Sequence, residues 1–517
     1  MQIPEYIKEI VERLEQANFE AYIVGGCVRD LLMSRPPKDW DITTNARPEK
    51  ILEIFPDGKY ENIFGTVLVP IKSANGETED VVEVTTYRSE QGYSDRRHPD
   101  EIKFEDNLEK DLERRDFTIN AMAAHVIARS SESLGATKQS RVSLSSQGIA
   151  SSSQTSPCLP DRQARNDISI VDLFGGQKDI EKKIIRAVGE PTDRFKEDAL
   201  RMIRAIRFAV ELNFSIEPKT ERAILKLAGA IKFVSKERIH DELVKILKSD
   251  YPADGIIILQ KTKLLQYIIP ELEAGVGVAQ NKHHTYTIFK HSVESLRHTK
   301  NKDYAVRLAS LLHDIGKPKV KKGEGENATF YNHDYVGAKI AGRVMERLKF
   351  SRDDIERVTN LVRNHMFYYN VDEVTAASVR RLINKVGSQN LQDLIDLRVA
   401  DRLGSGTPKA MPYKLRHLQY MMKKVQHDPV SVKMLKINGD DLMTGLKINP
   451  GPKIGAILDV LLAEVIENPK LNTKEYLETR GEELNKLELN ELRSKAKETI
   501  TEKKEQEDKE IKEEFWV

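Results

Sequence analysis

The feature of the sequence that most constrains the fold is a glycine pair followed by two closely spaced aspartates. Residues 19–24 are mostly apolar and predict a buried strand, which ends at Gly25 and Gly26. Glycine has no Cβ, so the backbone of this turn can approach a ligand closely. Asp39 and Asp41 are separated by one residue, and on a strand their carboxylates point to the same side. Two hard oxygen ligands beside a glycine turn favour a site for Mg²⁺ and a triphosphate.

An isolated Asp-x-Asp is also typical of a solvated strand edge, so the neighbouring residues matter. Arg29 is expected in the first turn of the helix after the glycines, where its charge adds to the positive helix dipole. With that support, Asp39 and Asp41 can hold two Mg²⁺ about 3.5–4 Å apart, one for an attacking hydroxyl and one for the triphosphate. Glu83 lies on a later predicted strand and fits either a third metal ligand or a solvent-facing residue.

The composition is that of a multidomain protein without membrane spans. Domains of roughly 100–200 residues predict three or four units in a chain of 517 residues, and a net charge of +1 confines any nucleic-acid-binding surface to local basic regions. No apolar stretch approaches the roughly 18 residues of a membrane span, and the first residues lack the pattern of a signal or transit peptide. Cys27 and Cys158 provide no disulfide framework, so we expect a cytoplasmic protein.

Several segments differ in pattern from the predicted core. Residues 88–99 are polar and predict a mobile loop, whereas residues 130–166 are rich in Ser, Gln and Ala and predict a disordered insertion. Amphipathic helices are predicted at 197–212 and 235–247. Residues 482–514 carry mixed charges at helical spacing, which predicts an exposed terminal helix.

Five motifs follow one another along the first half of the chain. They are residues 25–30 (GGCVRD) with 39–41 (DWD), residues 114–123 (RRDFTINAMA), residues 172–176 (DLFGG), residues 197–208 (EDALRMIRAIRF) and residues 235–243 (SKERIHDEL). Together they resemble the bacterial tRNA nucleotidyltransferase and poly(A) polymerase family, with its class II CCA-adding enzymes, in the polymerase-β-like superfamily. The resemblance implies that Arg115 and Asp116 contact the ribose and phosphates of the incoming nucleotide.

The predicted helix at 197–212 carries charged residues at every third position: Asp198, Arg201, Arg204 and Arg207. By itself this stripe fits an exposed basic face on which Asp198 pairs with Arg201. The resemblance implies instead that Asp198 and Arg201 read the base of CTP or ATP. Cytosine and adenine both present an amino donor beside a ring-nitrogen acceptor, which match a carboxylate and a guanidinium. Uracil and guanine present a carbonyl and an N–H there, so both contacts fail.

Two further expectations concern this template and the nucleotides it selects. Arg204 and Arg207 would reach phosphates or hold Asp198 in place, and the resemblance implies that Glu237, Arg238 and Glu242 brace the helix. In the family, enzymes that reach the final A keep a loop like residues 88–99. This favours addition of complete CCA or of the final A alone, with poly(A) synthesis left as an alternative.

A second group of residues resembles, in its order, the ligand set of an HD phosphohydrolase domain: His291, His313, Asp314 and Asp401. Imidazole and carboxylate together suit a transition metal or Mg²⁺, so the divalent metal is left unassigned. His333 and His365 are candidates for a second metal. The resemblance implies phosphatase or 2′,3′-cyclic phosphodiesterase activity, with a site kept only for folding as the alternative.

We therefore predict an α+β fold, with a polymerase-β-like nucleotidyltransferase head of mixed sheet and helices before an all-helical neck, HD domain and body. The predicted boundaries are 1–185 for the head, 186–275 for the neck, 276–405 for the HD domain, 406–480 for a tRNA-binding body and 481–517 for the charged terminal helix. The expected partners are tRNA, CTP and ATP, with Mg²⁺ in the head. The intact carboxylates argue against a non-catalytic RNA-binding protein or an HD phosphohydrolase whose head only binds nucleotide.

Overall fold

The structure is a computed structural model, in which the chain forms two compact units. It describes residues 3–61, 65–73, 75, 77–91, 101–126, 168–281, 285–367, 369–371, 374–407, 409–426, 432 and 435–516. Residues 1–278 with 343–355 form the first unit, and residues 279–342 with 356–517 form the second. The insertion predicted at 130–166 lies outside the described residues, as do residues 92–99 of the predicted loop.

The first unit begins with a mixed sheet. Its strands, in spatial order, are β3 (Lys59–Tyr60), β4 (Thr66–Lys72), β5 (Thr78–Thr86), β2 (Asp41–Thr44), β1 (Ala21–Val24), β8 (Ala123–Val126) and β9 (Ile168–Val171). β2 and β5 are parallel and the other neighbours are antiparallel. This sheet, with the helices that cover it, confirms the predicted α+β head.

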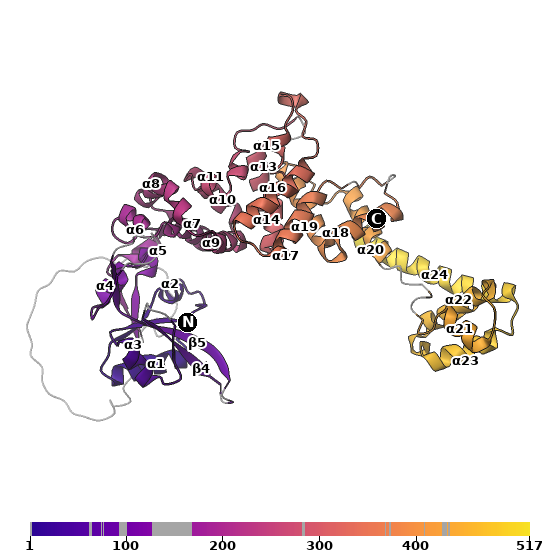
Figure 1. Ribbon diagram of the computed structural model, residues 1–517, viewed down its shortest axis with the longest axis horizontal. Helices are drawn as coiled ribbons and strands as arrows, with labels where there is room; N and C mark the ends of the chain where they lie inside the picture. Colours follow the sequence, from indigo (N-terminus) through magenta and orange to yellow (C-terminus); the bar gives the residue numbers. More distant parts are fainter. Residues whose placement is uncertain are drawn as a thin grey trace, which may run out of the picture. The chain divides into compact units, whose positions relative to one another are not determined.

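Three helices pack around this sheet: α1 (Glu5–Gln16), α2 (Gly26–Leu32) and α3 (Pro48–Ile54). α1 turns its buried apolar face inward, where Ile7 and Leu14 join Ile23 and Ile42 from the strands in one core. In Figure 1 the head is drawn in indigo, with α1 beside α3. The core fixes β1 and β2, and the turn and carboxylates of the candidate site lie at the ends of these strands.

The structure corrects two predictions in the head. β2 begins at Asp41, so Asp39 lies in a bend before the strand instead of on it. The first part of the predicted loop is also ordered, because β6 (Arg88–Gln91) pairs with β7 (Glu101–Phe104). A polar sequence therefore does not exclude a strand when a partner strand supplies its hydrogen bonds.

The rest of the first unit is mostly helical, but β10 (Ile184–Ile185) pairs with β11 (Ser215–Ile216), so the prediction of an all-helical neck is wrong at this point. Its main helices are α4 (Leu108–Glu113), α5 (Gly176–Glu181), α6 (Pro191–Glu197), α7 (Leu200–Leu212), α8 (Pro218–Leu227), α9 (Lys236–Lys248) and α10 (Pro252–Lys261). The prediction of a single helix at 197–212 is wrong at its first residues, because α6 ends at Glu197 and α7 begins at Leu200. Asp198 is extended (φ −139°, ψ 106°), and it separates α6 from α7. Its side chain accepts a hydrogen bond from the Leu200 N–H, which turns the chain into the next helix.

The second unit is all-helical. Its main helices are α13 (Ile288–His298), α14 (Tyr304–Leu312), α18 (Ala376–Val386), α19 (Leu391–Gly404), α20 (Tyr413–Gln426), α21 (Gly439–Leu446), α22 (Pro452–Glu467), α23 (Lys474–Leu484) and α24 (Leu489–Phe515). It also contains the first part of α16 (His333–Arg347) and the last part of α17 (Arg352–Asn364), since residues 343–355 belong to the first unit. α13 and α19 approach closely, because a Cβ on Gly404 would lie 2.3 Å from Ser295 Oγ and 2.6 Å from Ser295 N. Only glycine permits this contact, which brings two candidate ligand helices together.

The terminal charged helix begins later than predicted, and it contacts other helices near both of its ends. Residues 482–484 belong to α23, and the final helix begins at Leu489. Leu492 is buried against α22, and near the other end Asp508 accepts hydrogen bonds from Tyr420 and Lys424 of α20. The helix is therefore packed at both ends. In the described part of the chain no helix is long and apolar enough to cross a membrane.

Candidate active sites

The head brings three carboxylates together at the start of β2. Parallel pairing of β2 with β5 places Asp41 directly opposite Glu83, and Asp39 lies just before the strand. Burial raises the pKa of Asp41, Arg115 opposes this shift and the Asp39 charge adds to it. Burial and the Asp41 charge likewise raise the pKa of Glu83. Within the described residues, no hydrogen bond or ion pair engages the carboxylates of Asp39 and Asp41, so this oxygen-only cluster fits Mg²⁺.

The glycine turn lies against these carboxylates. Gly25 has a φ of +88°, and a Cβ there would lie 3.0 Å from Arg115 Nη1 and 3.6 Å from Asp41 Oδ2. The conformation therefore favours glycine, and a Cβ would also crowd the end of the Arg115 side chain. Arg29 donates to Asn120 Oδ1 at 2.8 Å and forms an ion pair with Asp30. The turn thus sits between a carboxylate and fixed guanidinium groups, as expected for a triphosphate site.

The arginine motif is held by a buried aspartate that the sequence analysis did not single out. Asp111 of α4 lies 2.7 Å from Arg114 Nη2 and 3.2 Å from Arg115 Nη2. Burial raises the pKa of Asp111, but the two guanidiniums overcome this and hold it below its usual value. Asp111 precedes Arg114 by three residues and Arg115 by four. On a helix this spacing brings the side chains together, and it was the signal in the sequence that could have identified Asp111. Asp111 orients Arg115 toward the turn.

The predicted template residues are close in sequence, but they do not pair with each other. Asp198 Oδ2 lies 2.6 Å from Arg238 Nη2 of α9, and Arg201 Nη1 lies 2.7 Å from Glu197 Oε2. Arg201 also donates to the Arg114 carbonyl at 3.2 Å. The alternative of an Asp198–Arg201 surface pair is therefore wrong, and the template helix is tied to the head through the backbone of Arg114.

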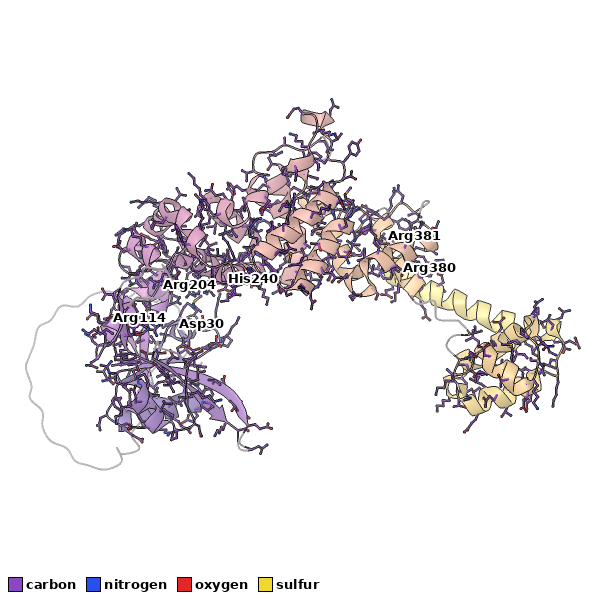
Figure 2. All side chains as sticks on the ribbon, in the orientation of Figure 1. Asp30, Arg114, Arg204, His240, Arg380 and Arg381 are labelled. Carbon is purple, nitrogen blue, oxygen red and sulfur yellow. The ribbon has the colours of Figure 1, made fainter. Side chains whose placement is uncertain are left out.

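Neither Arg204 nor Arg207 holds Asp198. Arg204 Nη2 lies 2.6 Å from the buried Asp116, and Arg207 Nε lies 2.7 Å from the buried Glu242. Burial raises the pKa of Asp116, but Arg204 overcomes this and lowers it below its usual value. Figure 2 marks Arg204 and Arg114 among the side chains of this unit. Both arginines fasten α7 to its neighbours, and Arg238 is the residue that positions Asp198.

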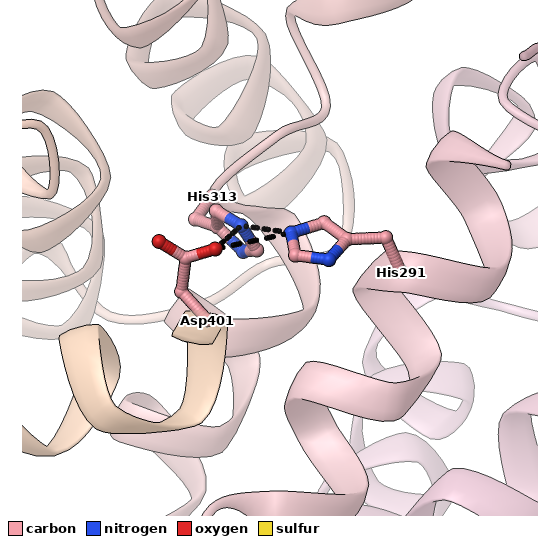
Figure 3. A group of neighbouring side chains, drawn as sticks. All are labelled: His291, His313 and Asp401. Carbon is pink, nitrogen blue, oxygen red and sulfur yellow. Dashed lines mark hydrogen bonds and ion pairs between the residues drawn. The ribbon is translucent and has the colours of Figure 1, made fainter. Parts of the chain in front are cut away.

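The second unit gathers the predicted histidines and aspartates into two groups: His291, His313 and Asp401, and Asp314, His333 and His365. Figure 3 shows the first group, whose side chains converge from α13, the end of α14 and α19. Asp314 joins the two groups, because its Oδ2 lies 3.2 Å from His291 Nε2 and its Oδ1 lies 3.4 Å from His333 Nε2.

The hydrogen bonds of the imidazoles fit metal ligation. The Nδ1 atoms of three rings face backbone carbonyls at 2.7–2.8 Å: His313 to Ser310, His333 to Phe330 and His365 to Val362. These contacts fix the tautomer and turn each Nε2 toward the centre. Nε2 atoms then face each other at 3.0 Å between His291 and His313 and at 3.3 Å between His333 and His365. His333 and His365 both use Nδ1 toward a carbonyl, so their facing Nε2 lone pairs favour a proton or a metal ion between them.

Electrostatics distinguish the two groups. Burial opposes the charging of His313, but Asp314 and Asp401 overcome it and raise the pKa of this ring to about 10. Burial and the His313 charge lower the pKa of His365 to about 3. The buried carboxylates therefore demand positive charge, and the donor set of imidazole and carboxylate suits first-row divalent metals. The predicted ligands of both groups, His333 and His365 included, are brought together.

A cleft of about 580 Å³ opens over this centre. Metal-ligand candidates line it together with the cations Lys317, Arg398 and Arg402. Lys317 Nζ is buried and lies 2.7 Å from Asp314 Oδ2. The volume falls in the range of about 300–1,000 Å³ that is common for small-molecule sites. Cations around a metal centre favour an anionic ligand.

Family models match three parts of the chain. Residues 21–134 match the poly A polymerase head domain, residues 213–275 match a probable RNA- and SrmB-binding site of polymerase A, and residues 283–405 match the HD domain. A CCA-adding enzyme of Ligilactobacillus salivarius is 31% identical over 486 residues, which cover 92% of this chain and 96% of the relative. The chain belongs to the tRNA nucleotidyltransferase family that includes the CCA-adding enzymes. The resemblance stated from the motifs is thereby confirmed.

Two other sequence relatives match over shorter stretches, and one solved structure matches over nearly the whole chain. An A-adding tRNA nucleotidyltransferase of Deinococcus radiodurans is 32% identical over 69% of this chain and 74% of its own length. A CCA-adding enzyme of Lactobacillus delbrueckii subsp. bulgaricus is 41% identical over 46% of this chain and 48% of its own length. The solved Bacillus stearothermophilus CCA-adding enzyme in complex with CTP has a TM-score of 0.56 at 25% identity and covers 94% of this chain and 98% of that one. The chain is thus a nucleotidyltransferase of this class, with the same fold.

Proposed function

We propose that the head adds CCA to tRNA 3′ ends from CTP and ATP without a nucleic-acid template. The observation that carries the proposal is the pairing of β2 with β5, which puts Asp41 opposite Glu83 and beside the Gly25 turn and Arg115. The Bacillus stearothermophilus relative was solved with CTP, and the Ligilactobacillus salivarius relative adds CCA by its name. These relatives and the carboxylate cluster support the same chemistry.

The residues of the head have separate roles in this reaction. Asp39 and Asp41, with Glu83 beside them, would hold Mg²⁺, which when bound neutralises the triphosphate and favours ionisation of the attacking hydroxyl. Arg115 and the Gly25 backbone orient the phosphates. The oxygen of the terminal ribose hydroxyl bonds to the α-phosphorus, the bond from that phosphorus to the bridging oxygen breaks, and pyrophosphate leaves. Catalysis is then mainly positioning and charge stabilisation.

The neck selects the base. We propose that the Asp198 carboxylate accepts from the amino group of cytosine or adenine and that Arg201 donates to the ring nitrogen. Arg238 holds Asp198 in place through the 2.6 Å ion pair. Glu197 and the Arg114 carbonyl hold Arg201. The template is thus supported from two directions, which keeps both groups aimed at one base edge.

Addition of the final A alone is the second candidate for the head, because the Deinococcus radiodurans relative is an A-adding enzyme. Poly(A) synthesis is the third, since the matched head model takes its description from poly A polymerase. Purified protein given tRNA transcripts that end before CCA, at C and at CC, with each labelled NTP singly and in pairs, separates the three. Growth by C, C and A supports CCA addition. Extension of only the CC transcript supports A addition, long A tails support poly(A) synthesis, and no incorporation with Mg²⁺ or Mn²⁺ rejects all of them.

For the second unit we propose metal-dependent hydrolysis of phosphate esters. The facing imidazole pairs, the shared Asp314 and the cationic cleft support this over a site kept only for folding. When bound, a divalent metal would supply a water of lowered pKa. Metal analysis of the purified chain, with hydrolysis of nucleoside 2′,3′-cyclic phosphates in Mn²⁺, Ni²⁺ or Mg²⁺, tests the proposal. Metal in the protein without hydrolysis in any of the three would favour the structural alternative.

A further inference from the structure

The cleft over the HD centre contains more positive charge than its candidate metal ligands use. Lys317 pairs with Asp314, and Arg398 donates to Asp401, so each of these cations has a metal-ligand candidate as its partner. Arg402 differs. Within the described residues it contacts no carboxylate, and its guanidinium donates to the Tyr369 hydroxyl at 3.1 Å and to the Lys409 carbonyl at 3.2 Å. A cation in a cleft without an anionic partner is a candidate ligand contact.

Two guanidiniums meet at one phenol oxygen. Arg398 and Arg402 are four residues apart on α19, which places them on the same helix face. Arg398 Nη2 lies 3.5 Å from the Tyr369 hydroxyl, and the other terminal nitrogen, Nη1, donates to Asp401. Burial raises the pKa of Tyr369, but Arg398 and Arg402 overcome it and lower the pKa below its usual value. The phenol oxygen therefore occupies a position that stabilises negative charge.

The same pair has unused donors. The Nε atoms of Arg398 and Arg402 are both buried and have no hydrogen-bond acceptor in the described part of the protein. A buried N–H without a partner costs free energy, and one phenol oxygen cannot satisfy so many N–H groups. A phosphate offers several acceptor oxygens in the geometry that guanidinium groups match. Tyr369 thus stands where a phosphate would bind better.

We propose that Arg398 and Arg402 bind a phosphate distinct from the one hydrolysed at the HD centre, and that this phosphate displaces the Tyr369 hydroxyl. The proposal rests on the hydrolase function proposed for the second unit. We call Arg398 and Arg402 the arginine clamp. Because Arg398 also contacts the ligand candidate Asp401, the clamp adjoins the metal centre. Two adjacent phosphates describe an RNA 3′ end, with a terminal monoester or 2′,3′-cyclic phosphate at the metals and the preceding internucleotide phosphate in the clamp.

The mouth of the cleft suits the same ligand. Tyr331 and Met366 both line the cleft, and they are 77% and 58% exposed, respectively. An exposed aromatic ring beside cations is typical of surfaces that stack the bases of single-stranded RNA. The reaction is hydrolysis. The oxygen of a water molecule bonds to the terminal phosphorus. The bond between this phosphorus and one ribose oxygen breaks, and the ribose oxygen takes a proton from the water.

The first test compares two probes on the full chain loaded with Mn²⁺. The dinucleotide CpC ending in a 2′,3′-cyclic phosphate carries the additional phosphate, and cytidine 2′,3′-cyclic phosphate lacks it. We expect kcat/KM to be about 10-fold or more higher for the dinucleotide. Arg402→Gln should bring the ratio of the two kcat/KM values down to about 1, because the dinucleotide loses more than the mononucleotide, and metal analysis of the variant checks that the metals are retained. Arg381→Gln is the matched control, because Arg381 is an exposed arginine of α18 outside the cleft lining (Figure 2).

Tyr369→Phe gives a change of opposite sign. Loss of the hydroxyl removes the group that occupies the clamp, so the dinucleotide should bind more tightly and the mononucleotide should not. Binding of a fluorescent CpC 3′-phosphate to the chelated, metal-free chain measures this separately from hydrolysis. If neither probe is hydrolysed but Arg402→Gln still weakens this binding, the hydrolase proposal fails and the clamp stands. Equal use of both probes by the unaltered chain, or weaker binding by Tyr369→Phe, would overturn the clamp.

Discussion

The two candidate metal centres use different atoms and different degrees of burial. The head offers carboxylate oxygens at a strand start, with Asp39 exposed to solvent. The HD centre offers four imidazoles and two buried aspartates inside a helical unit. Oxygen ligands with open positions suit Mg²⁺, which keeps waters and binds triphosphates, whereas buried imidazole sites hold first-row metals. Under the proposed functions, the head would take a metal that arrives with the substrate, whereas the HD centre would keep its metal.

The largest effect is expected at the head carboxylates. Asp41→Ala should reduce nucleotide incorporation into tRNA by about 100-fold or more, because the variant lacks a group that stabilises charge in the transition state. Hydrolysis of cyclic phosphates by the same protein should stay unchanged, since the two centres share no residue. A parallel loss of both activities would contradict the claim that the two centres act independently.

A substitution of Asp314, the candidate ligand shared by the two histidine groups, tests whether damage to the HD centre leaves nucleotide addition intact. Asp314→Asn removes the charge that contacts both histidine groups, so bound metal and hydrolysis should each fall by about 10- to 100-fold. Metal analysis and a cyclic phosphate assay measure this. Addition of CCA in Mg²⁺ is the internal control and should be retained. Retention of the full metal content would show that Asp314 is not a ligand.

Chelation sharpens the difference in ligand type. After treatment with EDTA, Mg²⁺ alone should restore nucleotide addition. Hydrolysis should remain about 10-fold or more below the level reached with Mn²⁺ or Ni²⁺, because imidazole ligands favour those metals over Mg²⁺. Paired assays on one chelated sample measure both. Equal recovery of the two activities in Mg²⁺ would contradict the proposed division of metals.

The smallest effect concerns base selection. Arg238→Gln leaves Asp198 without its 2.6 Å partner, so the carboxylate is no longer fixed against one base edge. We expect UTP incorporation relative to CTP to rise by about 10-fold, in proportion to one charged hydrogen bond. Arg222→Gln, at an exposed arginine of α8, is the matched control. An unchanged ratio would assign Arg238 to packing alone.

The sequence predicts the two centres better than it predicts the contacts that hold them. The spacing of Asp39 and Asp41, together with the glycine turn and Arg29, predicts the head site. The choice between the two interpretations of Glu83 depends on strand register, which pairs residues 42 positions apart. Spacing on one helix likewise favours an Asp198–Arg201 pair. The actual partner, Arg238, comes from a separate helix, and its pairing depends on how α7 packs on α9.

At the HD centre, the order of the residues in the sequence predicts the candidate metal ligands, but only the structure shows that they form two groups. The sequence cannot tell which oxygen of Asp314 faces which histidine, because this depends on where α14 ends relative to α13 and α16. The two separate contacts of Asp314 follow from that packing. The arginine clamp is also absent from any motif, since Tyr369 lies outside the helix that carries Arg398 and Arg402.

The central claim is that the head of this chain builds CCA independently of the HD centre. The most direct measurement is mass spectrometry of a tRNA transcript lacking CCA after incubation with CTP, ATP and Mg²⁺, with unaltered protein, Asp41→Ala and Asp314→Asn in parallel. We predict growth by two C and one A with the unaltered protein and Asp314→Asn, and none with Asp41→Ala. Growth with Asp41→Ala, or its loss with Asp314→Asn, would contradict the account.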